Sequence, residues 1–342
     1  MFESISTPPL PVGPTPSDPP ITQIIDIRSD KKDVELREAL QQSIHSDNAA
    51  LPDLLLWDEQ GLQYFEDVTY CLSYYLTQEE IGLLEKHRLQ IADRIQPGTM
   101  LVELGSGNLR KTRILLDALE ELGRPVDYFA LDVSYPELQR TLRPVAEGHY
   151  RHVRCFGLLG TYDDGRQWLQ HPDVQARPKT ILYLGSTLGN FQKPDAAEFL
   201  ASFTPANCSF LLGLDGCKDP HLVSQAYNDP NGVNYRFVKN GLVRANKILG
   251  YDAFDLDSWE VSGSWDEDEG AHSQYYHPVV DVSLDGTHIP AGRRLLAARS
   301  HKYDSNDQHQ LCQRAGLTVV DSWSSDSMYR KSLVRTSVHK AR

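Results

Sequence analysis

The 342-residue sequence is poor in cysteine, and its cysteines show no pairing pattern. Disulfide scaffolds and structural zinc sites need closely spaced ligands, but neither a Cys-x-x-Cys pair nor a paired histidine spacing occurs. We therefore expect a protein of a reducing compartment that holds no structural metal. The five cysteines are scattered along the chain: Cys71, Cys155, Cys208, Cys217 and Cys312.

Basic tracts and long apolar runs are missing as well. Lys and Arg number 34 against 47 Asp and Glu, a formal net charge of −13. Binding to a phosphate backbone depends on a basic surface, so nucleic acid is not an expected partner. No apolar run approaches the ~20 residues of a transmembrane helix, and the N-terminus lacks the basic and apolar pattern of a secretory signal. We expect a soluble, cytoplasmic monomer with no membrane partner.

What the sequence does contain is a glycine-bearing turn between a strand pattern and a helix pattern. Residues 101–112 read Leu-Val-Glu-Leu-Gly-Ser-Gly-Asn-Leu-Arg-Lys-Thr. Glycine permits positive φ and lets a ligand approach the backbone, and the first N–H groups of the following helix face the same place. A dinucleotide fingerprint needs a third glycine and a P-loop needs a glycine directly before Lys-Thr, but Arg110 occupies both positions.

The remaining pattern is Glu-x-Gly-x-Gly, which is typical of S-adenosylmethionine-dependent methyltransferases. Glu103 supplies a carboxylate at the end of the first strand, before Gly105 and Gly107. The next strand, 128–131, ends in Asp132, which is placed to accept hydrogen bonds from ribose hydroxyls at the carboxyl edge of a parallel sheet. Because Gly-x-Gly alone also forms plain tight turns, this second acidic strand end makes the prediction more specific.

From residue 100 onward, strand patterns alternate with helix patterns, which predicts an α/β fold with a doubly wound, parallel sheet. A helix at 306–315 and antiparallel strands at 317–323 and 329–338 complete it, which is the usual ending of a class I (Rossmann-like) methyltransferase. The other expected strands lie at 100–104, 127–131, 151–155, 180–184 and 209–214, and the other expected helices at 108–122, 135–146, 163–171 and 194–203.

The residues before this alternation predict a flexible tail and a mostly helical region. The first 20 residues are rich in proline, which is typical of a flexible segment. A strand at 24–27 and an amphipathic helix at 31–44 should follow. Thr77 and Glu80 predict a capping box for a helix that continues to about Ile95.

The regular alternation stops at residues 218–302, which we interpret as an insertion in the methyltransferase domain. A helix is expected at 238–249, and the acidic run 266–269 predicts a hairpin turn rather than a metal site. With the N-terminal region this insertion should form an α+β substrate-binding cap, with extended segments at 259–264, 272–284 and 294–299. The predicted division is a tail at 1–20, a cap at 21–78 and 218–302, and an S-adenosylmethionine-binding domain at 79–217 and 303–342.

A series of motifs resembles the histidine Nα-methyltransferase domain of ergothioneine biosynthesis, especially its fungal form. The likeness spans about residues 22–340, and stand-alone fungal relatives include tryptophan N-methyltransferases and an ergot-pathway enzyme that acts on an indole amine. The motifs occur in this order: Leu-Pro-x-Leu-Leu, Phe-Glu-x-x-Thr, Tyr-Tyr-Leu-Thr, Val-Glu-Leu-Gly-Ser-Gly-Asn-Leu-Arg-Lys, Ala-Leu-Asp-Val-Ser, Gly-Thr-Tyr-Asp-Asp-Gly, Leu-Gly-Ser-Thr-Leu-Gly-Asn-Phe, Ala-Tyr-Asn-Asp and Ser-His-Lys-Tyr.

The resemblance implies two sets of site residues. Tyr74, Asn190 and Tyr227 would hold the α-carboxylate and amine of an amino acid and count as the catalytic set. Trp57 stands where the family has a tyrosine near the reacting amine, so a hydroxyl cannot act there. The cofactor set combines residues of the strand-end motifs with residues that the resemblance implies: Glu103, Gly105, Gly107, Lys111, Asp132, Thr161, Tyr162 and Gly185.

The side-chain pocket departs from the histidine enzymes. Where those enzymes have a glutamate that binds imidazole, two residues before a Ser or Ala, this chain has Ala298 before Ser300. Loss of the carboxylate removes a charge-assisted bond of about 1.5–3 kcal/mol and frees volume for a larger apolar ring. Gln274 or Ser300 would accept or order a partner for an indole N–H. The alternative is a shifted alignment in which Glu267 or Glu269 serves instead.

These observations predict an S-adenosylmethionine-dependent Nα-methyltransferase of a free aromatic amino acid, with L-tryptophan the preferred substrate and the trimethylated betaine the product. Secondary metabolism is the expected setting. One alternative keeps L-histidine as the substrate, and another places an indole amine of an alkaloid pathway there. A third reading, from a different class, is a protein that binds the cofactor without catalysis.

Overall fold

The computed structural model describes residues 23–29, 32–44, 46, 50–146, 150–284, 286–325 and 329–336. The predicted tail at 1–20 lies outside these residues. The chain forms two compact units. The first comprises Met1–Arg28, His87–Leu182 and Ser202–Phe210, and the second comprises Ser29–Lys86, Tyr183–Ala201 and Leu211–Arg342.

The first unit is built on parallel strands in the order β1-β4-β3-β2-β5. Every residue of β2 and β3 is buried, as expected for the centre of a parallel sheet that is covered on both faces. Glu103 is the register partner of Ala130, so the two strands end at the same edge of the sheet. The strands are β1 (Ile24–Asp26), β2 (Met100–Leu104), β3 (Val126–Asp132), β4 (Val153–Leu159) and β5 (Lys179–Tyr183).

Three helices between these strands begin and end within two residues of the predicted ranges 108–122, 135–146 and 163–171, whereas the short helix at 172–175 was not predicted. The long helix α3 (Tyr75–Asp93) precedes β2 and belongs to both units, because the boundary falls at His87. The other helices of this region are α4 (Arg110–Glu121), α5 (Tyr135–Ala146), α6 (Tyr162–Leu169), α7 (Pro172–Gln175) and the short η3 (Thr204–Ala206).

Strand β6 (Cys208–Asp215) begins in the first unit and ends in the second, where the order continues β6-β13-β12. Strands β12 (Leu317–Ser324) and β13 (Tyr329–Thr336) pair antiparallel after α11 (Ser305–Arg314), as predicted. This antiparallel ending of a mostly parallel sheet confirms the class I methyltransferase fold. The second unit also holds η2 (Thr187–Asn190) and all but the last residue of α8 (Lys193–Ser202).

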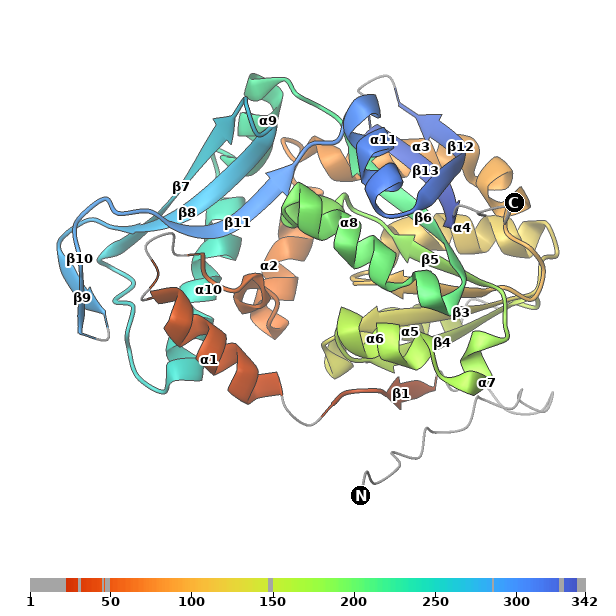
Figure 1. The fold of residues 1–342 in the computed structure, drawn as a ribbon, viewed down its shortest axis with the longest axis horizontal. Coiled ribbons are helices and arrows are strands. Elements are labelled where there is room, and N and C mark those ends of the chain that lie inside the picture. Colours follow the sequence, from red (N-terminus) through yellow and green to blue (C-terminus); the bar gives the residue numbers. More distant parts are fainter. Residues whose placement is uncertain are drawn as a thin grey trace. The chain divides into compact units, whose positions relative to one another are not determined.

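A second, antiparallel sheet in this unit has the order β11-β8-β7, and its strands run side by side in Figure 1. The helix α10 packs against β7, β11, α1, α2 and η1, so one long helix joins the N-terminal segment to this sheet. The elements are α1 (Lys32–Ile44), η1 (Asp53–Leu56), α2 (Glu59–Tyr70), α9 (Pro220–Tyr227), α10 (Val233–Leu249), β7 (Trp259–Asp266), β8 (Ala271–Pro278), the hairpin β9 (Val282–Leu284) and β10 (Thr287–Ile289), and β11 (Leu295–His301).

The acidic run 266–269 forms the turn between β7 and β8, as predicted. The predicted capping box of Thr77 and Glu80 is wrong. Helix α3 begins at Tyr75, so Thr77 is already inside the helix. Glu80 is fully buried, accepts the Gly185 N–H at 2.9 and 3.0 Å and pairs with the buried Lys331. The Glu80 carboxylate therefore links α3 to Gly185 and Lys331 and does not cap the helix.

Candidate active site

The glycine turn of the first unit has the backbone that the sequence predicts. Gly105 and Gly107 have φ values of 72° and 53°, which glycine adopts without the penalty that a side chain would add. The Gly105 N–H donates to the Leu131 carbonyl at 3.0 Å, which ties the turn to β3. A Cβ placed on Gly105 would lie 2.8 Å from the Tyr162 hydroxyl. The predicted cofactor residues Gly105 and Tyr162 are therefore in direct contact.

The two acidic strand ends have different surroundings. Both Glu103 oxygens accept hydrogen bonds, one from Thr112 Oγ1 at 2.6 Å and one from the Tyr128 hydroxyl. Because Thr112 lies in α4, this carboxylate fixes the helix that follows the turn. Asp132 is 6% exposed, and burial raises its pKa to about 6. Hydrogen bonds from the backbone N–H groups of Ser134 and Gly107 act in the opposite direction and lower this pKa. Side-chain hydroxyls thus bind the Glu103 carboxylate, whereas backbone N–H groups, that of Ser134 among them, bind Asp132.

The remaining predicted cofactor residues occupy turns and helix starts. Thr161 caps α6 in a reciprocal capping box, accepting from the Asp164 N–H while its own N–H donates to Asp164 Oδ2 at 2.8 Å. Lys111 lies in the first turn of α4. Gly185 belongs to the second unit, has a φ of 75° and donates its N–H to Glu80.

In the second unit, the predicted substrate residues lie along a row of aromatic rings. Trp57 packs edge-on against Phe65 at 5.1 Å between ring centroids, and Phe65 packs edge-on against Tyr74 at 6.2 Å. Tyr74 in turn meets Tyr227 at 5.8 Å, and Tyr227 stacks on the His272 ring at 4.7 Å. Trp57, Tyr74 and Tyr227 thus belong to one continuous row of packed aromatic rings, although Tyr227 lies far from the other two in sequence.

Tyr227 joins this row to a buried polar cluster. Its hydroxyl donates to Ser300 Oγ at 2.7 Å and accepts from the Lys302 ammonium at 2.9 Å. Lys302 also donates to Ser300 Oγ at 3.1 Å and pairs with Asp215 at 2.8 Å. The Tyr75 hydroxyl donates to the same Asp215 carboxylate at 2.5 Å. Burial raises the pKa of Tyr227 well above its usual range, so its phenol remains protonated.

The pocket residues predicted on β8 and β11 face each other. Ala298 is the register partner of Gln274, and Ser300 is the register partner of His272. Gln274 is buried, and its amide nitrogen donates to the Tyr227 carbonyl at 3.4 Å and to Asn234 Oδ1 at 3.2 Å. A carbonyl only accepts, so the Gln274 amide nitrogen must lie on that side and its oxygen on the other.

Asn190 ends η2, and its side chain is exposed. The preceding Gly189 packs directly on β11, because a Cβ there would lie 2.6 Å from the His301 carbonyl oxygen and 3.5 Å from Ser300 Oγ. The structure therefore brings the Asn190 turn beside Ser300. It places Tyr74, Tyr227, Gln274, Ala298, Ser300 and Asn190 in the second unit around one sheet face.

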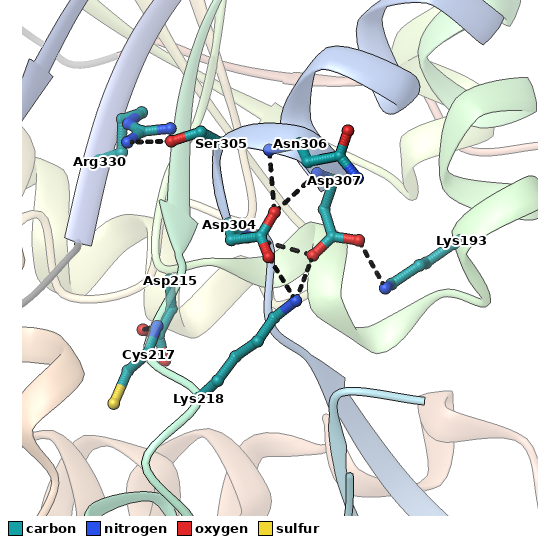
Figure 2. Close-up of polar contacts among 9 residues, drawn as sticks. All are labelled: Lys193, Asp215, Cys217, Lys218, Asp304, Ser305, Asn306, Asp307 and Arg330. Atoms are coloured by element: carbon teal, nitrogen blue, oxygen red, sulfur yellow. Dashed lines mark hydrogen bonds and ion pairs between the residues drawn. The ribbon is translucent and has the colours of Figure 1, made fainter. Parts of the chain in front are cut away.

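Two ion-pair groups hold the segments that carry the cluster. Figure 2 shows the Lys218 ammonium between Asp304 and Asp307, at 2.6 and 2.8 Å, while Lys193 reaches Asp307 at 2.8 Å. Lys218 follows Asp215 by three residues and Asp304 follows Lys302 by two, so the same two segments are joined twice. The inner pair is fully buried and the outer group is partly exposed.

Sequence reasoning missed Asp215, Lys302 and Tyr75. Asp215 ends a buried strand, the same signal that identified Asp132, and so was detectable. Lys302 stands in the Ser-His-Lys-Tyr motif without a predicted role, and its burial depends on strands that only the fold brings together. His272 was also missed; burial and the nearby Lys302 charge lower its pKa to about 4, so it is neutral.

Within the described ranges, no group of three or more His, Cys, Asp or Glu side chains is arranged to hold a metal ion. No helix of those ranges is long and apolar enough to cross a bilayer.

Comparison with known proteins identifies the family of this chain. A family model described as "Histidine-specific methyltransferase, SAM-dependent" matches residues 36–336. Ergothioneine biosynthesis protein 1 of Neurospora crassa is 43% identical over 321 residues, which cover 92% of this chain and 36% of that protein. The chain thus spans little more than a third of the Neurospora protein.

Two shorter relatives match over most of their length. N-methyltransferase imqF of Aspergillus flavus is 34% identical over 89% of this chain and 86% of that protein. The 4-dimethylallyltryptophan N-methyltransferase easF of Trichophyton verrucosum is 33% identical over 89% of this chain and 94% of that protein. The resemblance seen in the motifs is therefore confirmed, and the chain belongs to the family of histidine-specific, S-adenosylmethionine-dependent methyltransferases.

Proposed function

We propose that this enzyme transfers methyl groups from S-adenosylmethionine to the α-amine of a free aromatic amino acid, with L-tryptophan the preferred substrate and the trimethylated betaine the final product. The observation that carries the proposal is the pairing of Ala298 with Gln274. A small apolar residue stands opposite a neutral amide, so neither partner supplies the charge that would favour an imidazolium ring.

The head group of the amino acid would bind at Tyr74 and Tyr227. Burial raises the pKa of both phenols, so both remain hydrogen-bond donors suited to a carboxylate. The exposed amide of Asn190, next to Ser300 through Gly189, would direct the amine.

The indole N–H would be accepted by Gln274. Both hydrogens of its amide nitrogen point to Tyr227 and Asn234, so its oxygen is the atom left to accept. Ser300 Oγ already accepts from Tyr227 and Lys302, which makes it the poorer acceptor. An open pocket of about 270 Å³, just below the usual range of small-molecule sites, lies beside Gln274. Its lining includes Tyr227, Tyr235, Val261 and Gly263.

The protein's part in the reaction is orientation. S-adenosylmethionine, when bound, supplies a sulfonium methyl group, and Gly105, Gly107, Lys111, Asp132, Thr161 and Tyr162, with Glu103 and Gly185, would hold it. The amine would be fixed by Tyr74, Tyr227 and Asn190 with its lone pair aimed at that methyl carbon. Only the deprotonated amine attacks, because an ammonium group has no lone pair. Fixing a bound nucleophile in this way lowers the barrier of a direct displacement, because the two reacting groups no longer have to find each other.

L-Histidine is the second candidate substrate. The family description and the 43% identity to an ergothioneine biosynthesis protein favour it. The easF relative, named as a 4-dimethylallyltryptophan N-methyltransferase, favours the indole substrate instead. We also propose that the enzyme is a cytoplasmic monomer without nucleic-acid partners, divided into the cap and methyltransferase domains predicted from the sequence.

The test is incubation of the enzyme with an equimolar mixture of amino acids and tryptamine and with methyl-labelled S-adenosylmethionine, followed by mass spectrometry. We expect label in mono-, di- and trimethylated tryptophan. Label in histidine alone would replace tryptophan by the second candidate. Binding of S-adenosylhomocysteine in calorimetry without label in any amino acid or indole amine would support the non-catalytic alternative.

A further inference from the structure

Lys302 is a fully buried cation whose three ammonium hydrogens have three acceptors. They are Asp215 Oδ2 at 2.8 Å, the Tyr227 hydroxyl at 2.9 Å and Ser300 Oγ at 3.1 Å. An ammonium group has no further donor, so Lys302 does not itself contact an added ligand in this arrangement. Any effect of this lysine on a substrate passes through the two hydroxyl groups that it binds.

Those hydrogen bonds decide what the Tyr227 hydroxyl does. A phenol oxygen that accepts from an ammonium must direct its own hydrogen elsewhere, and here that hydrogen points to Ser300 Oγ. Ser300 accepts from both Tyr227 and Lys302. When a carboxylate takes the Tyr227 hydrogen, Ser300 keeps the Lys302 hydrogen bond, so neither oxygen is left without a partner.

Asp215 makes the cation acceptable in the interior. Its carboxylate receives Lys302, the Tyr75 hydroxyl at 2.5 Å and the Cys217 N–H at 2.9 Å. A buried charge with a charged, hydrogen-bonded partner avoids most of the penalty of an isolated one. The pair is neutral overall, so Lys302 orients the Tyr227 hydroxyl without adding a net positive charge to this buried cluster.

We infer that Lys302 is a positioning residue for the α-carboxylate of the substrate: it commits the Tyr227 hydroxyl to donation and so makes the enzyme prefer an amino acid over the corresponding amine. This inference rests on the proposed function, in which Tyr227 binds that carboxylate. The preference for an amino acid over its amine, which we assign to Lys302, does not depend on which aromatic side chain the substrate carries.

The test compares L-tryptophan with tryptamine as ligands, by calorimetry in the presence of S-adenosylhomocysteine. The main variant is the double substitution Lys302→Met with Asp215→Asn, which removes both charges and leaves no buried carboxylate unpaired. We expect its affinity for L-tryptophan to fall about tenfold to a hundredfold, as for loss of a charge-assisted hydrogen bond, with tryptamine changed less than about twofold. The single variant Lys218→Met, in the partly exposed outer ion-pair group, leaves Lys302 paired with Asp215 and bound to Tyr227 and should retain the preference for the amino acid.

Affinity for S-adenosylhomocysteine, measured in the same titrations, is the control for folding. If the double variant does not fold, Lys302→Leu with Asp215→Asn replaces it, because it removes the same two charges and leaves Tyr227 without a cationic donor. Unchanged affinity for L-tryptophan, or an equal loss for both ligands, would overturn the inference. If the wild-type enzyme binds L-histidine instead, the substrate proposal fails separately, and histidine with histamine tests Lys302 in the same way.

Discussion

Ala298 of β11 and Gln274 of β8 are direct register partners across the small sheet, on the strands that also carry Ser300 and His272. This pairing makes Ala298 the position at which substrate choice should be easiest to alter. Replacing Ala298 by Glu introduces a carboxylate opposite Gln274 and fills the space proposed for an indole. We expect Ala298→Glu to weaken tryptophan turnover and strengthen histidine turnover, each by about tenfold or more, from a new charge-assisted bond of about 1.5–3 kcal/mol.

The measurement is kcat/KM for both amino acids in competition. Ala298→Gln is the matched control, because it adds the same volume without the charge. It should weaken tryptophan turnover without favouring histidine. An unchanged ratio in Ala298→Glu would show that this position does not line the side-chain pocket.

Gln274 should recognise the indole N–H through its amide oxygen. If so, the wild-type enzyme binds L-tryptophan more tightly than 1-methyl-L-tryptophan, which lacks that hydrogen, and Gln274→Leu removes the difference. A neutral hydrogen bond contributes about 1 kcal/mol, so the wild-type ratio of affinities should be about fivefold. The affinities for the two ligands are compared within each variant, because Gln274 also donates to Asn234 and to the Tyr227 carbonyl and its replacement affects the binding of both ligands.

Tyr275 provides the control for this ratio. It is the next residue on β8, its side chain leaves the opposite face of the strand, and Arg294 lies over its ring at 5.2 Å. Tyr275→Leu should keep the preference for the unmethylated indole. A ratio near one in the wild-type enzyme would remove Gln274 from indole recognition.

The glycine turn predicts two substitutions of different severity. Gly105→Ala places a Cβ at positive φ and 2.8 Å from the Tyr162 hydroxyl, whereas a Cβ on Gly107 would meet no described atom within 4 Å. Gly107→Ala should therefore lower the free energy of unfolding only by the left-handed backbone strain, about 1–2 kcal/mol. Gly105→Ala should lower it by about 1–3 kcal/mol more, because the new Cβ crowds the Tyr162 hydroxyl.

Urea unfolding midpoints of the two variants give the comparison. Adding Tyr162→Phe to Gly105→Ala should recover most of the extra loss, and equal midpoints for the two alanine variants would contradict the crowding argument.

Local patterns were enough for the parts of the fold that depend on neighbouring residues. The strand before Gly105, the acidic strand end Asp132 and the turn at 266–269 each follow from a few adjacent residues, and the structure agrees with all three. The capping box failed because Thr77 and Glu80 have the right spacing in any helix, and only burial against Lys331 gives Glu80 its actual role.

The polar cluster shows the limit of such reasoning for the site. Lys302 and Asp215 are separated by 87 positions in the numbering of the chain, and neither residue signals its partner. The sequence indicated Tyr227 and Ser300 through family resemblance, but the lysine that commits the Tyr227 hydroxyl to donation depends on packing among β6, α9 and β11. Long-range pairings of this kind carry no local periodicity.

Cofactor binding should depend on pH through Asp132. Burial raises the pKa of this carboxyl to about 6 in the protein without ligand, and ribose hydroxyls donate best to the ionised form. Below pH 6 the Asp132 carboxyl must lose its proton before the ligand binds, so affinity for S-adenosylhomocysteine should fall by up to tenfold per pH unit as the pH is lowered and be constant above about pH 7.

Asp132→Asn should bind S-adenosylhomocysteine more weakly than the wild-type enzyme at pH 8, with little pH dependence between 5 and 8. Asp173→Asn, at an exposed position on α7 in the same unit, is the control and should retain the wild-type profile. Calorimetry across this range decides the matter: a wild-type profile in Asp132→Asn would mean that another group carries the titration and that the second acidic strand end does not bind the ribose.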